Sequence, residues 1–274
     1  MKIKFLGTAA AEAFPAMFCD CENCKKAKAL GGKNIRTRSQ TLIDNNLFID
    51  YPCDTYYHVI THNINLLDIK NVLITHIHDD HFYPNDLNWM ARGFSMPPED
   101  WQGITVYGSV DIKAPLSEIV ANSRGFLRCE SHPAFEPFYV GDYKVTALKA
   151  THGTENPYIY VIAKENKTLL YAQDTGLLPE ETWEYLKNSG LYFDAVVMDC
   201  TAGTTDISYS SHMGLPRNIK TRDEMLACGL VDANTKFILN HFSHNGGDAV
   251  YDDFVPIAKE NGFITSYEGL EIEI

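Results

Sequence analysis

The sequence predicts an α+β fold in which two mixed β-sheets lie together and helices cover their outer faces. Segments typical of strands and of helices follow one another irregularly along the 274 residues. Several consecutive strands are separated only by short turns, which joins them as hairpins. This order favours two sheets with helices outside over one doubly wound parallel sheet. No linker, internal repeat or low-complexity stretch divides the chain, so we expect one domain over residues 1–274.

The composition is typical of a soluble globular protein. Hydrophobic residues make up 45% of the chain, which is enough for a sizeable core. The formal net charge of −13 argues against an extended nucleic-acid-binding surface. It does not exclude a small anionic substrate, because bound cations reverse the local field. No apolar run has membrane-spanning length and residues 1–7 do not form a signal peptide, so we expect a cytoplasmic location.

The first half of the chain alternates strands with helices. Residues 2–6 form the first strand, and a hairpin turns at Asn45-Asn46, where both side chains tolerate a left-handed backbone. The other expected elements are the hairpin strands at 39–44 and 47–50, a helix at 54–67, a buried strand at 71–75, a helix beginning at 83–87, a strand at 104–107 and a helix at 111–122.

The second half continues the same alternation. A helix beginning at Thr221 is expected from its capping-box pattern, and a long polar loop at 204–216 carries His212. The other expected elements are strands at 135–139 and 143–150, a hairpin of 158–163 and 168–172, a helix at 179–189, a strand at 194–198, a strand at 236–239, a helix at 248–261 and two short strands within 263–273.

Metal-binding side chains are concentrated directly after the buried strand 71–75. The stretch Thr75-His76-Ile77-His78-Asp79-Asp80-His81 carries three imidazoles and two carboxylates in six positions. Imidazole suits Zn, Fe, Mn and Ni, and a carboxylate extends the choice to harder ions. The spacing of these side chains favours two ions side by side. Three other strands also end near a potential ligand, and these are His152, Asp174 and His241.

A second cluster is the C-x-C-x2-C pattern of Cys19, Cys21 and Cys24. Three thiolates at this spacing can close on one tetrahedral ion, but a structural zinc site needs a fourth ligand. Free buried thiols are the alternative. The remaining histidines include His58 and His62, which are four residues apart on an expected helix without an evident partner and are interpreted as surface or core residues. The role of His132 stays open.

The stretch from Thr75 to His81, followed by Thr151-His152-Gly153, Asp174-Thr175-Gly176 and His241, resembles the signature of the metallo-β-lactamase superfamily. The resemblance spans the chain from Leu6-Gly7-Thr8 to His241. It implies an αββα sandwich with a two-metal site at one edge. It further implies one ion held by His76, His78 and His152, a second ion held by Asp80, His81 and His241, and Asp174 bridging both. Zn, Mn or Fe would suit these ligands.

Finer features resemble the PhnP-type cyclic phosphodiesterase branch, which belongs to bacterial phosphonate degradation. In that branch three early cysteines and a later histidine hold a structural zinc, which here implies Cys19, Cys21, Cys24 and His244. A further histidine after an Asp-Cys-Thr strand end is the general acid of that branch. Asp199-Cys200-Thr201 and His212 match this arrangement, while the rest of the loop from Ala202 to Pro216 departs from it. A backbone-bonded loop histidine is the alternative for His212.

The resemblance implies a metal-dependent hydrolase, with a small cyclic or linear phosphodiester as the expected substrate. A hydroxide held by two ions would attack phosphorus, with Asp80 and Asp174 holding the ions and His212 protonating the leaving alkoxide. Lactam or thioester hydrolysis, RNA 3′-processing, and a non-catalytic metal- or cofactor-binding role like that of the PQQ-biosynthesis member are the alternatives. Asp50 and Asp79 are candidates for orienting the histidines. A homodimer is an open alternative to a monomer.

Overall fold

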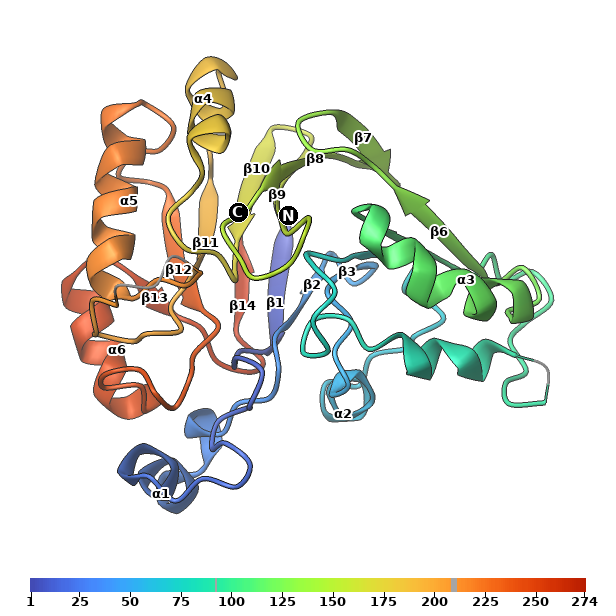
Figure 1. Ribbon diagram of the computed structural model, residues 1–274, viewed down its shortest axis with the longest axis horizontal. Helices are drawn as coiled ribbons and strands as arrows, with labels where there is room; N and C mark the ends of the chain where they lie inside the picture. The colour runs from blue at the N-terminus through green and yellow to red at the C-terminus, as the bar shows by residue number, and fades with distance from the viewer. Residues whose placement is uncertain (92, 208–210) are drawn as a thin grey trace.

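The computed structural model describes residues 1–91, 93–207 and 211–274, and its strands form two seven-stranded sheets (Figure 1). The first sheet contains, in spatial order, β14 (Glu271–Glu273), β1 (Lys2–Gly7), β2 (Gln40–Ile43), β3 (Leu47–Ile49), β4 (Asn71–Leu73), β5 (Ile104–Gly108) and β6 (Leu127–Ser131). The second contains β13 (Ile264–Thr265), β12 (Lys236–Asn240), β11 (Ala195–Asp199), β10 (Lys167–Ala172), β9 (Tyr158–Lys164), β8 (Tyr143–Lys149) and β7 (Pro137–Val140).

Both sheets are mixed, as the sequence predicts. Antiparallel hairpins such as β2–β3 and β9–β10 lie toward one side of each sheet, and parallel strands lie toward the other. Within β10, Leu169 and Tyr171 enter the core between the sheets, while Leu170 and Ala172 enter the core beneath the helices. Because both faces of such a strand are buried, its sequence is a continuous apolar run and not an alternating one.

Helices cover the outer face of each sheet and complete the predicted αββα sandwich. The second sheet packs on α4 (Glu180–Asn188), α5 (Leu215–Ala227) and α6 (Tyr251–Glu260) through one large apolar cluster. The first sheet packs on α3 (Lys113–Asn122) and the 3₁₀ helix η2 (Pro84–Met90) through another. Figure 1 shows these two helical layers on opposite sides of the sheets.

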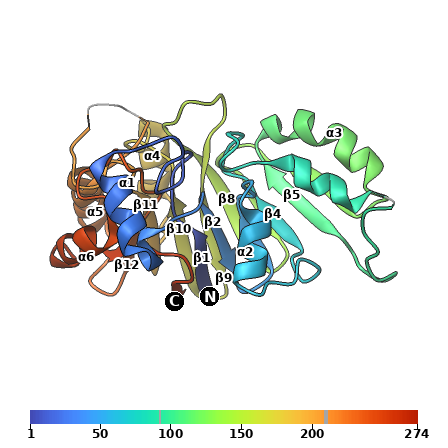
Figure 2. The ribbon, with the colours of Figure 1, turned by 90° about the horizontal axis from the view of Figure 1, so that it is seen from below.

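The remaining helices are short. Seen from below in Figure 2, α1 (Glu22–Leu30) lies beside α6, and α2 (Thr55–Thr61) lies toward the first sheet. Cys24 and Ala27 of α1 share a small apolar cluster with Ala249 and Val250, directly before α6. Two further 3₁₀ turns are η1 (Gly32–Asn34) and η3 (Val110–Ile112). None of the helices in the described part of the chain is long and apolar enough to cross a membrane.

Several expected element boundaries are wrong. The helix expected from Thr221 begins at Leu215, because extended Gly214 precedes it and proline suits its first turn. Thr221 is therefore a buried mid-helix residue and not a cap. The helix expected over 54–67 ends at Thr61, and a left-handed Asn63 follows. β6 was not predicted. Positions 208–210 of the expected polar loop lie outside the described residues.

Candidate metal centre and active site

The strands of the second sheet deliver polar residues to one edge. β8 and β10 are both antiparallel to β9, and β11 and β12 are parallel to β10, so these four strands run in the same direction. Their carboxyl ends therefore lie at the same edge of the sheet. His152, Asp174, Asp199 and His241 each lie at, or within three residues beyond, one of these ends. The sequence predicts this strand-end pattern for His152, Asp174 and His241, and the sheet topology explains it.

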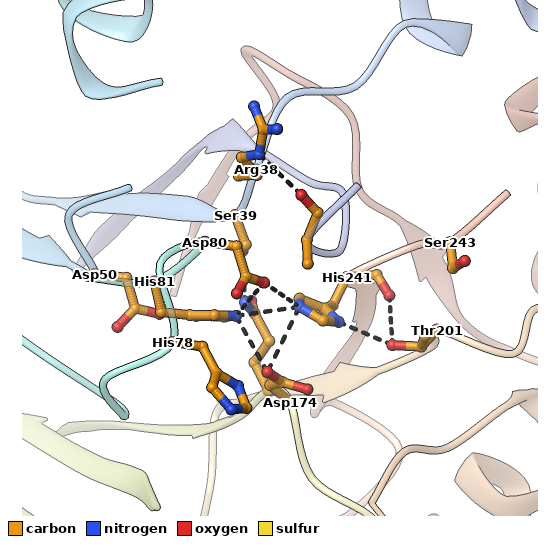
Figure 3. A network of polar contacts seen from close by, with 12 residues as sticks. Arg38, Ser39, Asp50, His78, Asp80, His81, Asp174, Thr201, His241 and Ser243 are labelled. Atoms are coloured by element: carbon orange, nitrogen blue, oxygen red, sulfur yellow. Dashed lines mark hydrogen bonds and ion pairs between the residues drawn. The ribbon is translucent and has the colours of Figure 1, made fainter. Parts of the chain in front are cut away.

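The first sheet contributes the facing group. Asp50 follows β3, and Thr75 with its metal-binding stretch follows the neighbouring parallel strand β4. Asp50, Asp174 and His241 have φ values of 65°, 52° and 65°. This left-handed region is uncommon for residues other than glycine, and at all three positions it occurs where a strand gives way to the site. Figure 3 shows side chains from both sheets pointing toward a common centre.

One group of potential ligands surrounds His78. The Nδ1 atom of His78 lies 3.0 Å from Nε2 of His76 and 3.0 Å from Nε2 of His152. The Oδ2 atom of Asp174 lies 3.2 Å from Nε2 of His76 and 3.3 Å from Nε2 of His152. His76 and Asp174 are buried, whereas His78 is exposed. This group opens to solvent on the side of His78.

A second group shares Asp174 with the first. The Nε2 atom of His81 lies 3.2 Å from Nε2 of His241, 3.2 Å from Oδ2 of Asp80 and 3.1 Å from Oδ2 of Asp174. All four residues are buried. The seven residues expected from the sequence therefore form two adjoining groups of possible metal ligands, joined through the Asp174 carboxylate.

These distances suit ions of zinc size. Ligand atoms 2.0–2.1 Å from a tetrahedral ion are separated from one another by about 3.3 Å, close to the observed spacing. The buried Oδ1 atom of Asp174 forms no hydrogen bond of good geometry among the described residues, and its nearest charged partner is Nδ1 of His212 at 3.0 Å.

In four histidines Nδ1, the outer ring nitrogen that faces away from the ligand groups, contacts an oxygen atom. Nε2, the inner ring nitrogen, is then free to bind a metal. His81 Nδ1 lies 2.7 Å from Oδ2 of Asp50, and His152 Nδ1 lies 3.3 Å from the carbonyl oxygen of Ser211. A proton on each outer nitrogen places a lone pair on the inner Nε2 atom. His76 Nδ1 lies 3.1 Å from the hydroxyl of Thr75 and His241 Nδ1 lies 2.8 Å from the hydroxyl of Thr201.

Two aspartates organise these outer contacts. Asp50 accepts hydrogen bonds from the Thr75 amide at 2.8 Å and the Thr75 hydroxyl at 2.9 Å, in addition to His81. Asp199 accepts a hydrogen bond from the Thr201 hydroxyl at 2.9 Å. Asp79 is exposed and has no hydrogen bond or ion pair within the described ranges, so of the two candidates only Asp50 contacts a site histidine. Nothing in the spacing of the sequence distinguished them.

The charges at this centre strongly affect one another. Burial disfavours the charged form of His81, but Asp80 and Asp50 outweigh it and hold the pKa of His81 well above its ordinary value. Burial opposes ionisation of Asp174, yet His241 and the other imidazoles hold the pKa of this carboxyl well below its usual range. Burial lowers the pKa of His76 to about 4, so its imidazole is neutral at pH 7 and able to bind a metal.

His212 lies at the edge of both groups. Its Nδ1 atom is 3.2 Å from Oδ2 of Asp199 and 3.0 Å from Oδ1 of Asp174, although the latter approach does not form a hydrogen bond. Its ring stacks on that of His241 with centroids 5.9 Å apart. Burial disfavours the imidazolium, but the two carboxylates raise the pKa of His212 to about 10. The Nε2 atom has no partner among the described residues.

The three cysteines meet a histidine from the far end of the chain. The Sγ atoms of Cys19 and Cys21 each lie 3.4 Å from Nδ1 of His244, and Cys24 completes the group. Zinc–sulfur and zinc–nitrogen bonds of ordinary length would separate these atoms by about 3.6 Å. Burial works against the Cys21 thiolate, but His244 and the Cys24 amide lower its pKa to about 6. The group suits one tetrahedral ion.

The other histidines lie outside these groups. His58 is a core residue, with Nδ1 2.7 Å from Oε1 of Gln40 and Nε2 2.6 Å from the hydroxyl of Thr37. His132 stacks face to face on Phe138 at 3.9 Å. Neither these two nor His62 joins a group of possible metal ligands among the described residues.

Comparison with known proteins identifies the family. A family model described as a beta-lactamase superfamily domain matches residues 57–242. The chain belongs to the metallo-β-lactamase superfamily. Most members of this superfamily are metal-dependent hydrolases, and the His/Asp groups described above fit a metal site. No curated protein sequence matches the chain.

Solved structures share the metallo-β-lactamase fold over the full chain. A diphosphatase from the PhnP family is 17% identical with a TM-score of 0.76, and 100% of this chain and 97% of that chain are covered. Zn²⁺-bound PqqB from Methylobacterium extorquens is 18% identical with a TM-score of 0.73 and full coverage of both chains. The short form of human tRNase Z is 15% identical with a TM-score of 0.65, covering 100% and 99%. At these identities the likeness establishes the fold alone.

Proposed function

We propose that residues 1–274 form one hydrolase domain that cleaves a small cyclic or linear phosphodiester. The observation that carries this proposal is the pair of ligand groups joined through Asp174, with His212 beside them. The PhnP-family diphosphatase and tRNase Z, both similar in fold, carry names that denote cleavage of a bond to phosphorus. The net charge of −13 favours a small substrate over an extended nucleic acid.

The two groups define which residues would hold divalent ions. His76, His78 and His152 would hold one, and Asp80, His81 and His241 the other, with the Asp174 carboxylate shared. Two such ions, whether Zn, Mn or Fe, would polarise a phosphoryl oxygen and lower the pKa of a water nucleophile. Four residues orient the imidazoles so that their nitrogens can bind these ions, and they are Asp50, Thr75, Thr201 and Asp199.

Three contacts of His212 support a role in proton transfer. Asp199 accepts from Nδ1 of His212, which keeps that nitrogen protonated and fixes the plane of the ring. Nε2 then becomes the atom at which a proton is exchanged. With its side chain 24% exposed, His212 can reach a bound ester without becoming solvated like a surface residue. We assign it as the general acid that protonates the leaving alkoxide.

The cysteine group has a structural role in this proposal. Cys19, Cys21, Cys24 and His244 would hold one zinc ion, which joins residues that are 225 positions apart in the sequence. His244 lies three residues beyond His241, so an ion here would fix the loop that presents His241 to the catalytic centre. No side chain of this group enters the catalytic groups among the described residues.

Metal-dependent turnover tests the proposal. Protein stripped of metal and reloaded with Zn or Mn should hydrolyse bis(p-nitrophenyl) phosphate, and should act far less on nitrocefin or on a thioester. Asp174→Asn should abolish turnover, whereas Asp142→Asn, an exposed carboxylate on the β7–β8 turn, should leave it unchanged. Preferred cleavage of nitrocefin or the thioester contradicts the assignment. No turnover of any ester by fully loaded protein favours a non-catalytic metal- or cofactor-binding role.

A further inference from the structure

A cavity of about 610 Å³ lies on the first-sheet side of the molecule, outside the catalytic groups. Its walls come from the segment after β3, from α2, from η2 and from the loop that leads into β5. A volume of this size is typical of pockets for small organic molecules. No residue that lines the cavity belongs to a metal-ligand group. The cavity is therefore separate from the proposed hydrolytic chemistry.

The lining combines aromatic side chains with one carboxylate. Tyr51, Tyr56, Trp89 and Trp101 supply the rings, and Asp86 is the one charged residue among the described residues that line the cavity. Aromatic faces carry negative potential, which attracts cations and not anions. The carboxylate adds a full negative charge to that field. A cavity with this lining disfavours an anionic phosphoester.

Two polar groups of this lining lack partners. Asp86 is half-buried, and no hydrogen bond or ion pair joins its carboxylate to any described residue. Tyr51 is 5% exposed, and its hydroxyl likewise has no hydrogen-bond partner in the described part of the chain. Burial is the main cause that raises the pKa of the Tyr51 hydroxyl, and the negative charge of Asp86 raises it further. Asp86 is therefore close enough to Tyr51 to affect it electrostatically. Because neither group is among the fully enclosed polar atoms without a partner, both are accessible from the cavity, where a bound ligand could pair with them.

The surrounding structure is held in place without using these groups. Arg124 donates to the carbonyl oxygen of Met90 at 3.0 Å and 2.7 Å and to the Ser95 hydroxyl at 3.2 Å, which fixes the loop on one side. Trp101 donates to the carbonyl oxygen of Leu67 at 2.9 Å. These contacts orient the walls and leave the Asp86 carboxylate free to pair with a ligand.

We propose that this cavity binds a small organic cation with a bulky apolar body. The ammonium group would pair with Asp86 and lie against the tryptophan and tyrosine faces, while the apolar part would fill the space beside Met90 and Leu87. A neutral molecule of the same shape would leave the carboxylate desolvated and unpaired. An anion would meet direct repulsion.

Three adamantane derivatives test the proposal, because they share one apolar body and differ only in charge. Isothermal titration calorimetry on the metal-loaded protein, with excess inorganic phosphate to occupy the metal centre, should show 1-adamantylammonium binding at least ten-fold more tightly than 1-adamantanol, and 1-adamantanecarboxylate binding most weakly. Asp86→Asn should bring the ammonium and the alcohol to within three-fold of each other. Asp142→Asn, which removes an exposed charge elsewhere, should keep the full preference.

Trp89 provides an independent second variant, because the residue is 54% exposed and belongs to none of the buried apolar clusters of the described residues. Trp89→Ala should weaken binding of the ammonium several-fold, with an unchanged thermal unfolding midpoint. Equal binding of the ammonium and the alcohol overturns the proposal, as does a preference that survives Asp86→Asn. Absence of binding by all three compounds overturns it as well.

Discussion

Asp50→Asn changes one atom and should disable His81 as a ligand. Asp50 is fully buried and accepts from three donors, which are the His81 ring, the Thr75 amide and the Thr75 hydroxyl. An asparagine has one acceptor oxygen and one NH₂ donor. If its oxygen faces Thr75, its NH₂ group faces Nδ1 of His81, which must then give up its proton. The ring would carry that proton on Nε2, where it blocks metal binding.

The structure supplies the magnitude. The His81–Asp50 contact of 2.7 Å is a charge-assisted hydrogen bond between buried groups, worth roughly 1.5–3 kcal/mol. A loss of that size corresponds to a ten- to hundred-fold weaker hold on the ion, which is the range expected when a group that orients a metal-bound histidine is removed. The ligand atoms themselves remain in place.

Competition with a chromophoric chelator measures the affinity for the ion, and turnover of bis(p-nitrophenyl) phosphate measures the consequence. We expect Asp50→Asn to bind the ion at the His81 group ten- to hundred-fold less tightly and to lose activity that excess metal partly restores. Asp44→Asn is the control, because Asp44 pairs with Lys164 away from the site. Metal affinity within three-fold of wild type would show that Asp50 does not set the tautomer of His81.

Three further predictions concern other parts of the chain. His212→Ala should lower kcat for a diester about 10²-fold or more with unchanged metal content, and an unchanged kcat would refute the acid role. His244→Ala should lose the zinc of the cysteine group, which metal analysis measures. If the free energy of unfolding falls by about 2 kcal/mol, Tm falls by roughly 4–8 °C. Full zinc occupancy would refute the assignment. Burial lowers the pKa of His58 to about 4, so the unfolded chain takes up a proton before the folded protein does. The free energy of unfolding of wild type minus that of His58→Asn should be constant above about pH 6.5 and should fall by about 3 kcal/mol between pH 6.5 and pH 4. Urea unfolding measures this difference, and a difference independent of pH would refute the prediction.

The sequence predicted the sheets and the ligand groups because both have short-range signals. Buried strands are apolar runs, and His152, Asp174 and His241 each lie within three residues of the end of such a run. The two-sheet sandwich was expected for the same reason and is confirmed by the topology. The start of α5 is misplaced because a capping-box pattern such as that at Thr221 also occurs inside helices, whereas Gly214 and the proline of the first turn mark the true start.

Other features depend on distance in space and carry no local signal. Asp50 and Asp79 are equally plausible from spacing, and only the parallel pairing of β3 with β4 brings Asp50 against His81. Thr201 was expected only as part of a motif, yet its hydroxyl supports His241. The aromatic cavity is lined by segments spread over residues 51–104 with no shared pattern. Such arrangements follow from tertiary packing.

The ligand groups lie across the seam between the two sheets. His76, His78, Asp80 and His81 belong to the first sheet's loops, and His152, Asp174 and His241 to those of the second. An ion that binds ligands from both sheets stabilises the packing of one sheet on the other by RT ln(1 + [M]/Kd). This is about 2.7 kcal/mol when the metal is in hundred-fold excess over Kd. Linkage works in both directions. The hydroxyl of Tyr160 on β9 donates to the carbonyl oxygen of Ile74, two residues before His76, across the same seam at 2.6 Å, so loosening that contact should lower the affinity for the metal.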